Sequence, residues 1–199
     1  MCGRTSLAVD VGRLANRFGA LPREGVEIPE RYNISPGQNL AAIQNDAPEE
    51  IDMLEWGFIP EWADDPDDVP TPINARSETA AEKPMFRKAF EQRRCLIPAD
   101  GFYEWAGQRG NKQPYRIELA DREPYAYAGL WETWSANGAE TRVTCTILTT
   151  EANEVVGEIH DRMPVMLEPD EEATWLNGGG IDELQQVCDP YPADEMRAY

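Results

Sequence analysis

The sequence consists of short apolar runs that are repeatedly broken by its 16 prolines and 15 glycines. No run approaches the ~18 apolar residues that a membrane-spanning helix needs, and neither an internal repeat nor a long low-complexity linker occurs. A chain of 199 residues is long enough for one hydrophobic core and too short for two independent enzymatic lobes. We therefore expect a single domain over residues 1–199.

Runs rich in aromatic and β-branched side chains predict the strands. These runs are 40–44, 52–56, 95–99, 115–119, 125–130 and 142–148. Helices are predicted at 11–18, 78–82, 85–92, 154–159 and 170–176. In the first of these, Asp10 is the expected N-cap and Gly19 the expected end, and in the second Ser77 is the expected N-cap. Because helices and strands do not alternate strictly, we expect an α+β domain with a curved, largely antiparallel, barrel-like sheet and short flanking helices.

Acidic residues outnumber basic ones by 37 to 18, which gives a formal net charge of -19. Such a charge normally argues against nucleic acid, because phosphate binding requires local positive charge. The only lysines are Lys83, Lys88 and Lys112, and an acidic, lysine-poor surface is typical of halophilic proteins, whose self-repulsion is screened in molar salt. The segment 61–70 carries five acids and no base, which predicts an exposed loop.

The four cysteines, Cys2, Cys95, Cys145 and Cys188, are too far apart for a CxxC pair or a metal-ligand spacing. The start of the chain also lacks the basic-then-apolar layout of a secretory signal. We therefore expect reduced thiols and a cytoplasmic protein. No glycine-rich phosphate loop, GxSxG or HExxH motif occurs, so no nucleotide cofactor or metal is expected.

Cys2 is the first candidate for chemistry. If Met1 is removed, Cys2 offers a free α-amine and a thiol two carbons apart, and this aminothiol is a specific reagent for aldehydes. The amine condenses with the aldehyde to an imine, and the thiol then closes a five-membered thiazolidine ring. The alternative is that Cys2 is only a small residue that follows the initiator methionine.

Two further segments carry polar side chains suited to a substrate. Asn74 and Arg76 share one face if their segment is extended, and Arg76 favours phosphate or carboxylate oxygens; a turn asparagine and a surface ion pair are the alternative. Glu104 lies between Tyr103 and Trp105. If it is desolvated there, it could shuttle protons near neutrality. Strand alternation alone slightly favours the alternative, an outward-facing carboxylate between two core aromatics.

His160 is the only histidine of the chain. Histidine is the side chain whose ordinary pKa lies near neutrality, so a general acid–base step of that kind must use His160. Asp161 and Arg162 beside it could orient the ring or hold a phosphate. Alternatively, His160 is structural, and the two charged neighbours form a solvated pair.

Eight segments, in order, resemble the SRAP family, the SOS-response-associated peptidases that sense abasic sites in single-stranded DNA. They are MCGR (1–4), RYNISPGQ (31–38), WGFIPEW (56–62), INARSET (73–79), RCLIPADGFYEW (94–105), AGLWETW (128–134), TILTTEAN (146–153) and IHDRMPVML (159–167). The resemblance covers nearly the whole chain.

The resemblance implies a protein of the DNA damage response that binds single-stranded DNA and crosslinks covalently to abasic sites through its processed N-terminal cysteine. It also implies proteolytic removal of the protein's own N-terminal residue, a hydrolase activity, and weak β-elimination (lyase) activity. No cofactor and no membrane partner are implied, and we expect a monomer. The implied catalytic residues are Cys2, Asn74, Glu104 and His160; the implied phosphate contacts are Arg4, Arg76 and Arg162, and the implied base-stacking or wedging residues are Trp62 and Pro36.

Two features depart from the family pattern. Family members usually continue past the segment that corresponds to YPADEMRAY with another short strand-forming segment, whereas this chain ends at Tyr199. The acidic segment 61–70 also surrounds Trp62, near the expected DNA groove. We infer that covalent capture compensates for weak phosphate contacts, because a closed thiazolidine does not depend on counterion release.

Two other functions remain open from the residues. Cys2 could be the nucleophile of an N-terminal-nucleophile amidohydrolase or peptidase, with its own amine as base. Alternatively, the chain could be a noncatalytic single-strand binding module in which arginines and tryptophans bind DNA.

Overall fold

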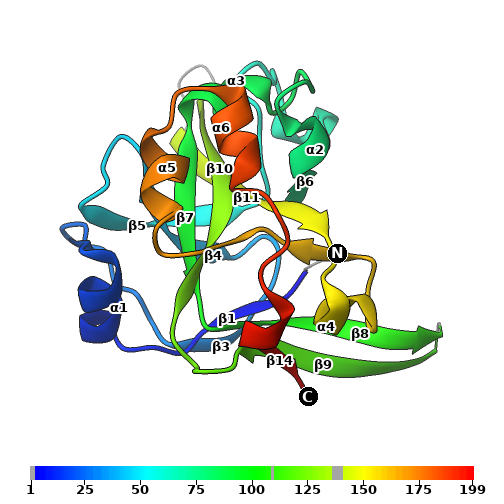
Figure 1. Ribbon diagram of the computed structural model, residues 1–199. Helices are drawn as coiled ribbons and strands as arrows, with labels where there is room; N and C mark the ends of the chain where they lie inside the picture. The colour runs from blue at the N-terminus through cyan, green and yellow to red at the C-terminus, as the bar shows by residue number, and fades with distance from the viewer. Residues whose placement is uncertain (1–2, 109, 136–140) are drawn as a thin grey trace.

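The computed structural model describes residues 3–108, 110–135 and 141–199, and Figure 1 shows how their elements are arranged. The strands are β1 (Thr5–Leu7), β2 (Leu21–Pro22), β3 (Arg31–Ile34), β4 (Asn39–Gln44), β5 (Glu50–Trp56), β6 (Asn74–Arg76), β7 (Arg94–Ala99), β8 (Gly101–Gln108), β9 (Asn111–Leu119), β10 (Tyr125–Ser135), β11 (Thr141–Glu151), β12 (Arg162–Pro164), β13 (Met166–Leu167) and β14 (Met196–Ala198). The helices are α1 (Val11–Phe18), α2 (Ser77–Ala80), α3 (Arg87–Gln92), α4 (Glu154–Gly157), α5 (Glu172–Asn177) and α6 (Ile181–Gln186). Two 3₁₀ turns, η1 (Pro66–Asp68) and η2 (Ala193–Glu195), complete the described elements.

The larger sheet closes into a small barrel. Its strands follow the order β11-β10-β7-β4-β5 with antiparallel neighbours, and β5 returns to β11 through a parallel pairing of Glu55 with Thr144 and Trp56 with Cys145. The short strands β2, β6, β12 and β13 extend this sheet at its margins. The structure therefore confirms an α+β domain with a curved, largely antiparallel sheet.

The second sheet has the order β14-β9-β8-β1-β3, and all its pairs are antiparallel. It lies along the lower edge of the molecule in Figure 1. Buried side chains on its inner face join the same core as the barrel, and Thr5 Oγ1 and Tyr127 Oη share a hydrogen bond of 3.0 Å between the two sheets. The chain start is thereby tied to the centre of the fold.

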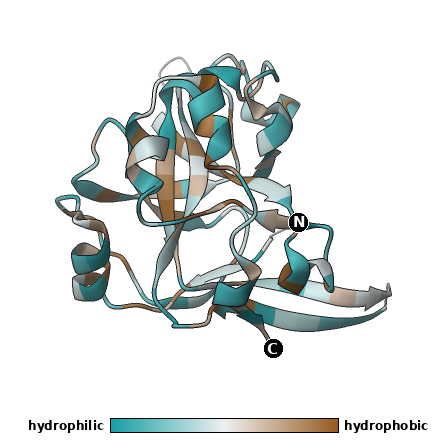
Figure 2. Ribbon diagram, in the orientation of Figure 1, coloured by the Kyte–Doolittle hydropathy of each residue, from teal (hydrophilic) through white to brown (hydrophobic). Residues whose placement is uncertain are grey.

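The short helices cover the barrel, and Figure 2 shows that their outer faces are largely hydrophilic. In α5, the indole of Trp175 is fully buried and donates a hydrogen bond of 3.1 Å to the carbonyl of Cys95 in β7. Helix α1 matches its prediction at both ends: Asp10 Oδ1 accepts from the Arg13 N–H at 3.0 Å, and Gly19 ends the helix at a φ of 66°. No helix in the described residues is both long and apolar enough to span a membrane.

Several predicted boundaries are wrong. Ser77 is the first residue of α2 and not its cap; it is buried, and the N-cap is Arg76 without a side-chain hydrogen bond. Helices α3 and α5 each begin two residues later than predicted, and α4 ends at Gly157. The helix α6 was not predicted, and neither were the strands β1, β2, β3, β6, β8, β12, β13 and β14, most of which are short and gain their order from neighbouring strands.

Two other sequence expectations are confirmed in the described residues. Cys95, Cys145 and Cys188 are buried and unpaired, and burial raises the pKa of the Cys188 thiol to about 12. Most of the segment 61–70 is exposed and irregular apart from η1.

Candidate functional site

The chain enters the second sheet next to Glu104. Strand β1 pairs with β8 so that Thr5 lies opposite Phe102, and the Tyr103 N–H donates to the Arg4 carbonyl at 2.9 Å. In this antiparallel register, each step back from Thr5 matches one step forward from Phe102, so Gly3 is level with Glu104. Cys2 lies outside the described residues. The described chain thus leads to Glu104 at the point where Cys2 must follow.

Glu104 faces the interior. It shares a sheet face with the fully buried Phe102, and its own exposure is only 4%. Tyr103 and Trp105, on the opposite face, are only partly buried. The outward-facing alternative is therefore wrong: the desolvated residue of this triplet is the carboxylate, and the flanking aromatics are the more exposed members.

Asn74 and Arg76 occupy one side of β6, as predicted. The strand runs parallel to β11, with Asn74 opposite Ile147 and Arg76 opposite Thr149. Ala75 between them is buried, Asn74 is half-buried and Arg76 is exposed. The alternation places the amide and the guanidinium together at the outer edge of the barrel, so a turn assignment for Asn74 is wrong.

His160 follows α4, where its N–H donates to the Val156 carbonyl at 2.9 Å. Its Nδ1 accepts the Arg162 N–H at 3.0 Å and also lies 2.9 Å from Asp161 Oδ1. The Arg162 N–H can only donate, so Nδ1 accepts from it when the ring is neutral, whereas a protonated Nδ1 would donate to Asp161. Nε2 is used by neither of these two contacts.

Strand β11 and one pocket link the segments that carry Asn74, Glu104 and His160. Thr149 of β11 lies opposite Arg76 on one side and opposite Pro164 of β12 on the other, so β11 separates the Asn74 segment from the His160–Arg162 segment by a single strand. Residues neighbouring Glu104 and His160 line a common pocket. The structure thus links these segments to one another, and Glu104 in turn lies level with Gly3.

Arg162 is already engaged with protein atoms. Its side chain is 11% exposed, forms a bidentate ion pair with Glu78 and donates to the Thr149 carbonyl at 2.6 Å. The hydrogen bond from Arg162 lowers the pKa of Glu78. A phosphate bound here would have to compete with this carboxylate. Arg4 similarly donates to Asn33 Oδ1 at 2.9 Å, whereas Arg76 is exposed.

The two residues expected to contact bases are both at the surface. Trp62 is 60% exposed and lines a hollow of about 310 Å³ with Pro60 and Met85. Pro36 is exposed in the turn that follows β3, next to Gly37, whose φ is 79°.

Sequence reasoning missed the pocket beside Glu104. Its lining includes Tyr115, directly opposite Glu104 across β8 and β9, and Ile159, which precedes His160. Tyr115 was included in a predicted strand, but only the pairing of β9 with β8 reveals that it neighbours Glu104. No motif in the chain marks it.

A comparison with protein-family models matches residues 1–199 to the SOS response associated peptidase (SRAP) family. The chain belongs to the SRAP family. A SRAP relative from Bacillus subtilis, named abasic site processing protein YoqW, is 44% identical over 206 residues, spanning 100% of this chain and 91% of that protein. Abasic site processing protein YedK of Escherichia coli is 35% identical over 147 residues, covering 73% of this chain and 64% of YedK.

The fold of this SRAP chain also resembles solved structures. A crystal structure of a protein from Bacteroides thetaiotaomicron superposes with a TM-score of 0.92 at 28% identity, over 100% of this chain and 91% of that one. The match includes the barrel and the second sheet, so the arrangement that leads the chain start to Glu104 belongs to the shared fold.

Proposed function

We propose that this SRAP chain captures abasic sites in single-stranded DNA as a covalent adduct on Cys2. The observation that most directly supports this proposal is the register of β1 on β8, which leads the start of the chain to the buried Glu104. The names of the relatives, which are abasic site processing proteins, support the substrate class. The role in the DNA damage response follows from the same membership of the family.

The chemistry begins with removal of Met1, which frees the α-amine of Cys2. This amine adds to the aldehyde of the ring-opened abasic sugar, and loss of one water gives an imine. The thiol then adds to the imine carbon, and its proton moves to the nitrogen, which closes the thiazolidine. The ring-closing step therefore releases nothing, and the whole adduct contains protein plus oligonucleotide less one water.

The described side chains supply proton transfer and orientation. Glu104 moves protons during imine formation, since a carboxylate in a water-poor site near the reacting amine can both accept and return them. Asn74 orients the amine or the sugar, and His160 donates from Nε2 to assist sugar-ring opening. An imine on the sugar also permits slow β-elimination, the basis of a weak lyase activity.

The DNA contacts in this proposal lie around that site. Arg4, Arg76 and Arg162 hold phosphates, and Arg162 exchanges Glu78 for phosphate when DNA binds. Trp62 and Pro36 contact bases that flank the lesion, because exposed aromatic and proline rings stack on bases without sequence preference.

Intact mass spectrometry after mixing with an abasic oligonucleotide tests the proposal. The expected adduct is protein without Met1 plus oligonucleotide, less one water. Cys2→Ala keeps an amine but has no thiol, so its imine should be seen only after borohydride reduction. A wild-type adduct that retains Met1, or an equally stable adduct of Cys2→Ala without reductant, would contradict the proposal.

The same assay separates the other two functions. An N-terminal-nucleophile amidohydrolase would turn over peptide or amide substrates repeatedly and leave no stable DNA adduct. A noncatalytic binding module would bind the oligonucleotide equally well after Cys2→Ala and form no covalent species.

A further inference from the structure

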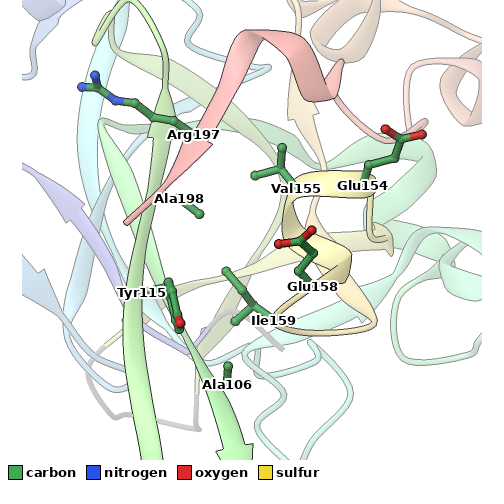
Figure 3. A pocket seen from close by; sticks show the side chains of 8 residues that line it. All are labelled: Ala106, Tyr115, Glu154, Val155, Glu158, Ile159, Arg197 and Ala198. Carbon is green, nitrogen blue, oxygen red and sulfur yellow. The ribbon is translucent and has the colours of Figure 1, made fainter.

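A pocket of about 550 Å³ lies between α4 and the strands β8, β9 and β14 (Figure 3). It adjoins the candidate site on two sides. Tyr115 on its wall is the cross-strand partner of Glu104, at a Cα separation of about 5 Å, and Ala106 follows Glu104 on the same sheet face. On the opposite wall, Ile159 directly precedes His160.

The pocket combines apolar walls with one inward carboxylate. Val155, Ile159 and Ala198 supply aliphatic surface around the Tyr115 ring. In Figure 3 the Glu158 carboxylate lies on the side of α4 that faces the strands, whereas that of Glu154, at the pocket rim, is turned away.

Of the charged side chains around the pocket, the arginine has an ion-pair partner among the described residues and the two glutamates do not. The Arg197 guanidinium points out of the pocket and is paired with Glu118. In the described part of the chain no side chain forms an ion pair with Glu154 or Glu158. The pocket therefore suits an apolar group that carries a positive charge and disfavours phosphate.

The direction of β1 points toward this pocket. From Thr5 to Gly3 the chain runs alongside β8 from Phe102 to Glu104, and the next residues of β8 in that direction lead to Ala106 on the pocket wall. A strand advances about 3.3 Å per residue. A residue that precedes Cys2 is thus within a short reach of the pocket.

We propose that this pocket binds the residue that is cut away ahead of Cys2, with its apolar side chain against Val155, Ile159 and Tyr115 and its α-ammonium group at Glu158. The inference rests on the proposed function, in which the Cys2 amine must first be freed. In the cleavage, water gives its hydroxyl to the carbonyl carbon of the leaving residue and a proton to the Cys2 nitrogen. The products are free methionine and the Cys2 amine.

The test follows loss of Met1 in purified protein. The chain is expressed behind a ubiquitin-like fusion partner whose own protease leaves Met1 as the first residue, so that host aminopeptidases cannot act beforehand. Intact mass then reports Met1 removal with time. We expect Glu158→Gln to slow removal about tenfold, because one charge-assisted hydrogen bond is weakened. Ala198→Phe, which fills the pocket, should slow it at least as much.

The matched control is Glu154→Gln, which removes the same charge from the same helix and should stay within about twofold of wild type. The identity of the leaving residue gives a second arm: Met1→Leu should be processed, and Met1→Glu should be processed at least about tenfold more slowly, because its carboxylate would be desolvated against the apolar wall. Equal rates for Glu158→Gln and Glu154→Gln, or no Met1 loss in wild type, would overturn the inference.

A second fusion that ends directly before Cys2 separates this inference from the proposed function. Chains released with Cys2 already first should crosslink to abasic DNA at the wild-type rate in both pocket variants. Slower crosslinking without slower Met1 removal would assign the pocket to DNA and overturn the inference. If the wild-type chain that starts at Cys2 fails to crosslink, the proposed function is refuted. The rates of Met1 removal would still test the inference about the pocket.

Discussion

At the scale of single residues, the burial of Glu104 is the most informative feature of the site. A carboxylate that is 4% exposed on a sheet face of apolar side chains contributes nothing to solubility and is costly to desolvate. The fold retains it at the level of Gly3, the residue that follows Cys2 in the sequence. This combination of cost and position is the argument for a chemical role.

Glu104→Gln keeps the shape of the side chain but removes its capacity to accept and return a proton. We expect the single-turnover rate of adduct formation to fall by about a hundredfold or more, within the usual range for loss of a general acid–base group. Gel or mass analysis of quenched time points measures this rate.

Glu172→Gln is the matched control, because Glu172 is also a buried glutamate, at 9% exposure, but lies on α5, where it is paired with Arg17 of α1. Its crosslinking rate should stay within about twofold of wild type. Equal rates for wild type and Glu104→Gln would remove Glu104 from the mechanism.

The sequence alone could identify candidate site residues, but it could not predict which of them are buried or which side chains they contact. Strand alternation placed Asn74 and Arg76 on one face correctly, since that follows from two-residue spacing. The same alternation favoured the outward orientation of Glu104 and was wrong, because which face is inside depends on the pairing of β8 with β1 and β9. The engagement of Arg162 by Glu78, 84 positions away, likewise has no local signature.

At the scale of elements, a buried arginine joins the helices to the barrel. Arg94 is 4% exposed and begins β7, and burial lowers its pKa. Its guanidinium donates to backbone carbonyls at the ends of α3 and α5, namely those of Phe90, Glu91, Trp175, Leu176 and Gly178. It serves as a shared C-terminal cap for two helices.

Arg94→Met should lower the free energy of unfolding by about 3–5 kcal/mol, because it leaves several buried carbonyls without donors. Urea unfolding monitored by circular dichroism measures the loss. Arg87→Met, at an exposed position of α3, should change stability by less than about 0.5 kcal/mol. A small loss for Arg94→Met would show that water replaces the guanidinium.

The edge strand β14 is held through Glu118 on β9. Burial alone would raise the pKa of Glu118, but hydrogen bonds from Arg116 and Arg197 outweigh it, and the net pKa is lowered. A carboxyl whose folded pKa is lowered stabilises the fold above its unfolded pKa of about 4.3, and this stabilisation is lost as pH falls through the folded pKa.

Glu118→Gln should therefore be less stable than wild type at pH 7, and the difference should shrink as pH falls below about 4. Denaturant unfolding at several pH values measures the two curves. A difference that is independent of pH would show that the Glu118 charge does not stabilise the folded state.

Elements with local signals were predictable from the sequence, and elements without them were not. Helix α1 carries its own cap and stop residues, and the barrel strands are rich in aromatic and β-branched side chains. By contrast, β1 is three residues long and exists because β3 and β8 pair with it on both sides. Its order comes from partners far along the chain, which no window of sequence contains.

At the scale of the whole molecule, the net charge of -19 predicts that stability depends on ions. Raising KCl from 0.1 M to 1 M shortens the Debye length from about 10 Å to about 3 Å, which screens repulsion among surface carboxylates. We expect the Tm to rise by several degrees over this range in differential scanning calorimetry. A neutral osmolyte at equal osmolality should not reproduce the rise, and a flat or falling curve would contradict salt adaptation.

Salt should also separate the two modes of DNA binding. Affinity for an intact single strand rests on phosphate contacts and should become undetectable by anisotropy in molar KCl. The yield of adduct with an abasic strand should persist there after long incubation, because the thiazolidine once closed needs no counterion release. Parallel loss of both would contradict covalent capture as the compensation for an acidic surface.

The position of β1 has a consequence for biosynthesis. Although Thr5 is among the first residues to leave the ribosome, its side chain bonds to the Gly101 carbonyl, 96 positions later, and to Tyr127, 122 positions later. The second sheet can therefore form only after β8 has been translated. Under the proposed function, a nascent chain would have no Glu104 beside Cys2 before that point, and its reaction with aldehydes would begin only in the finished protein.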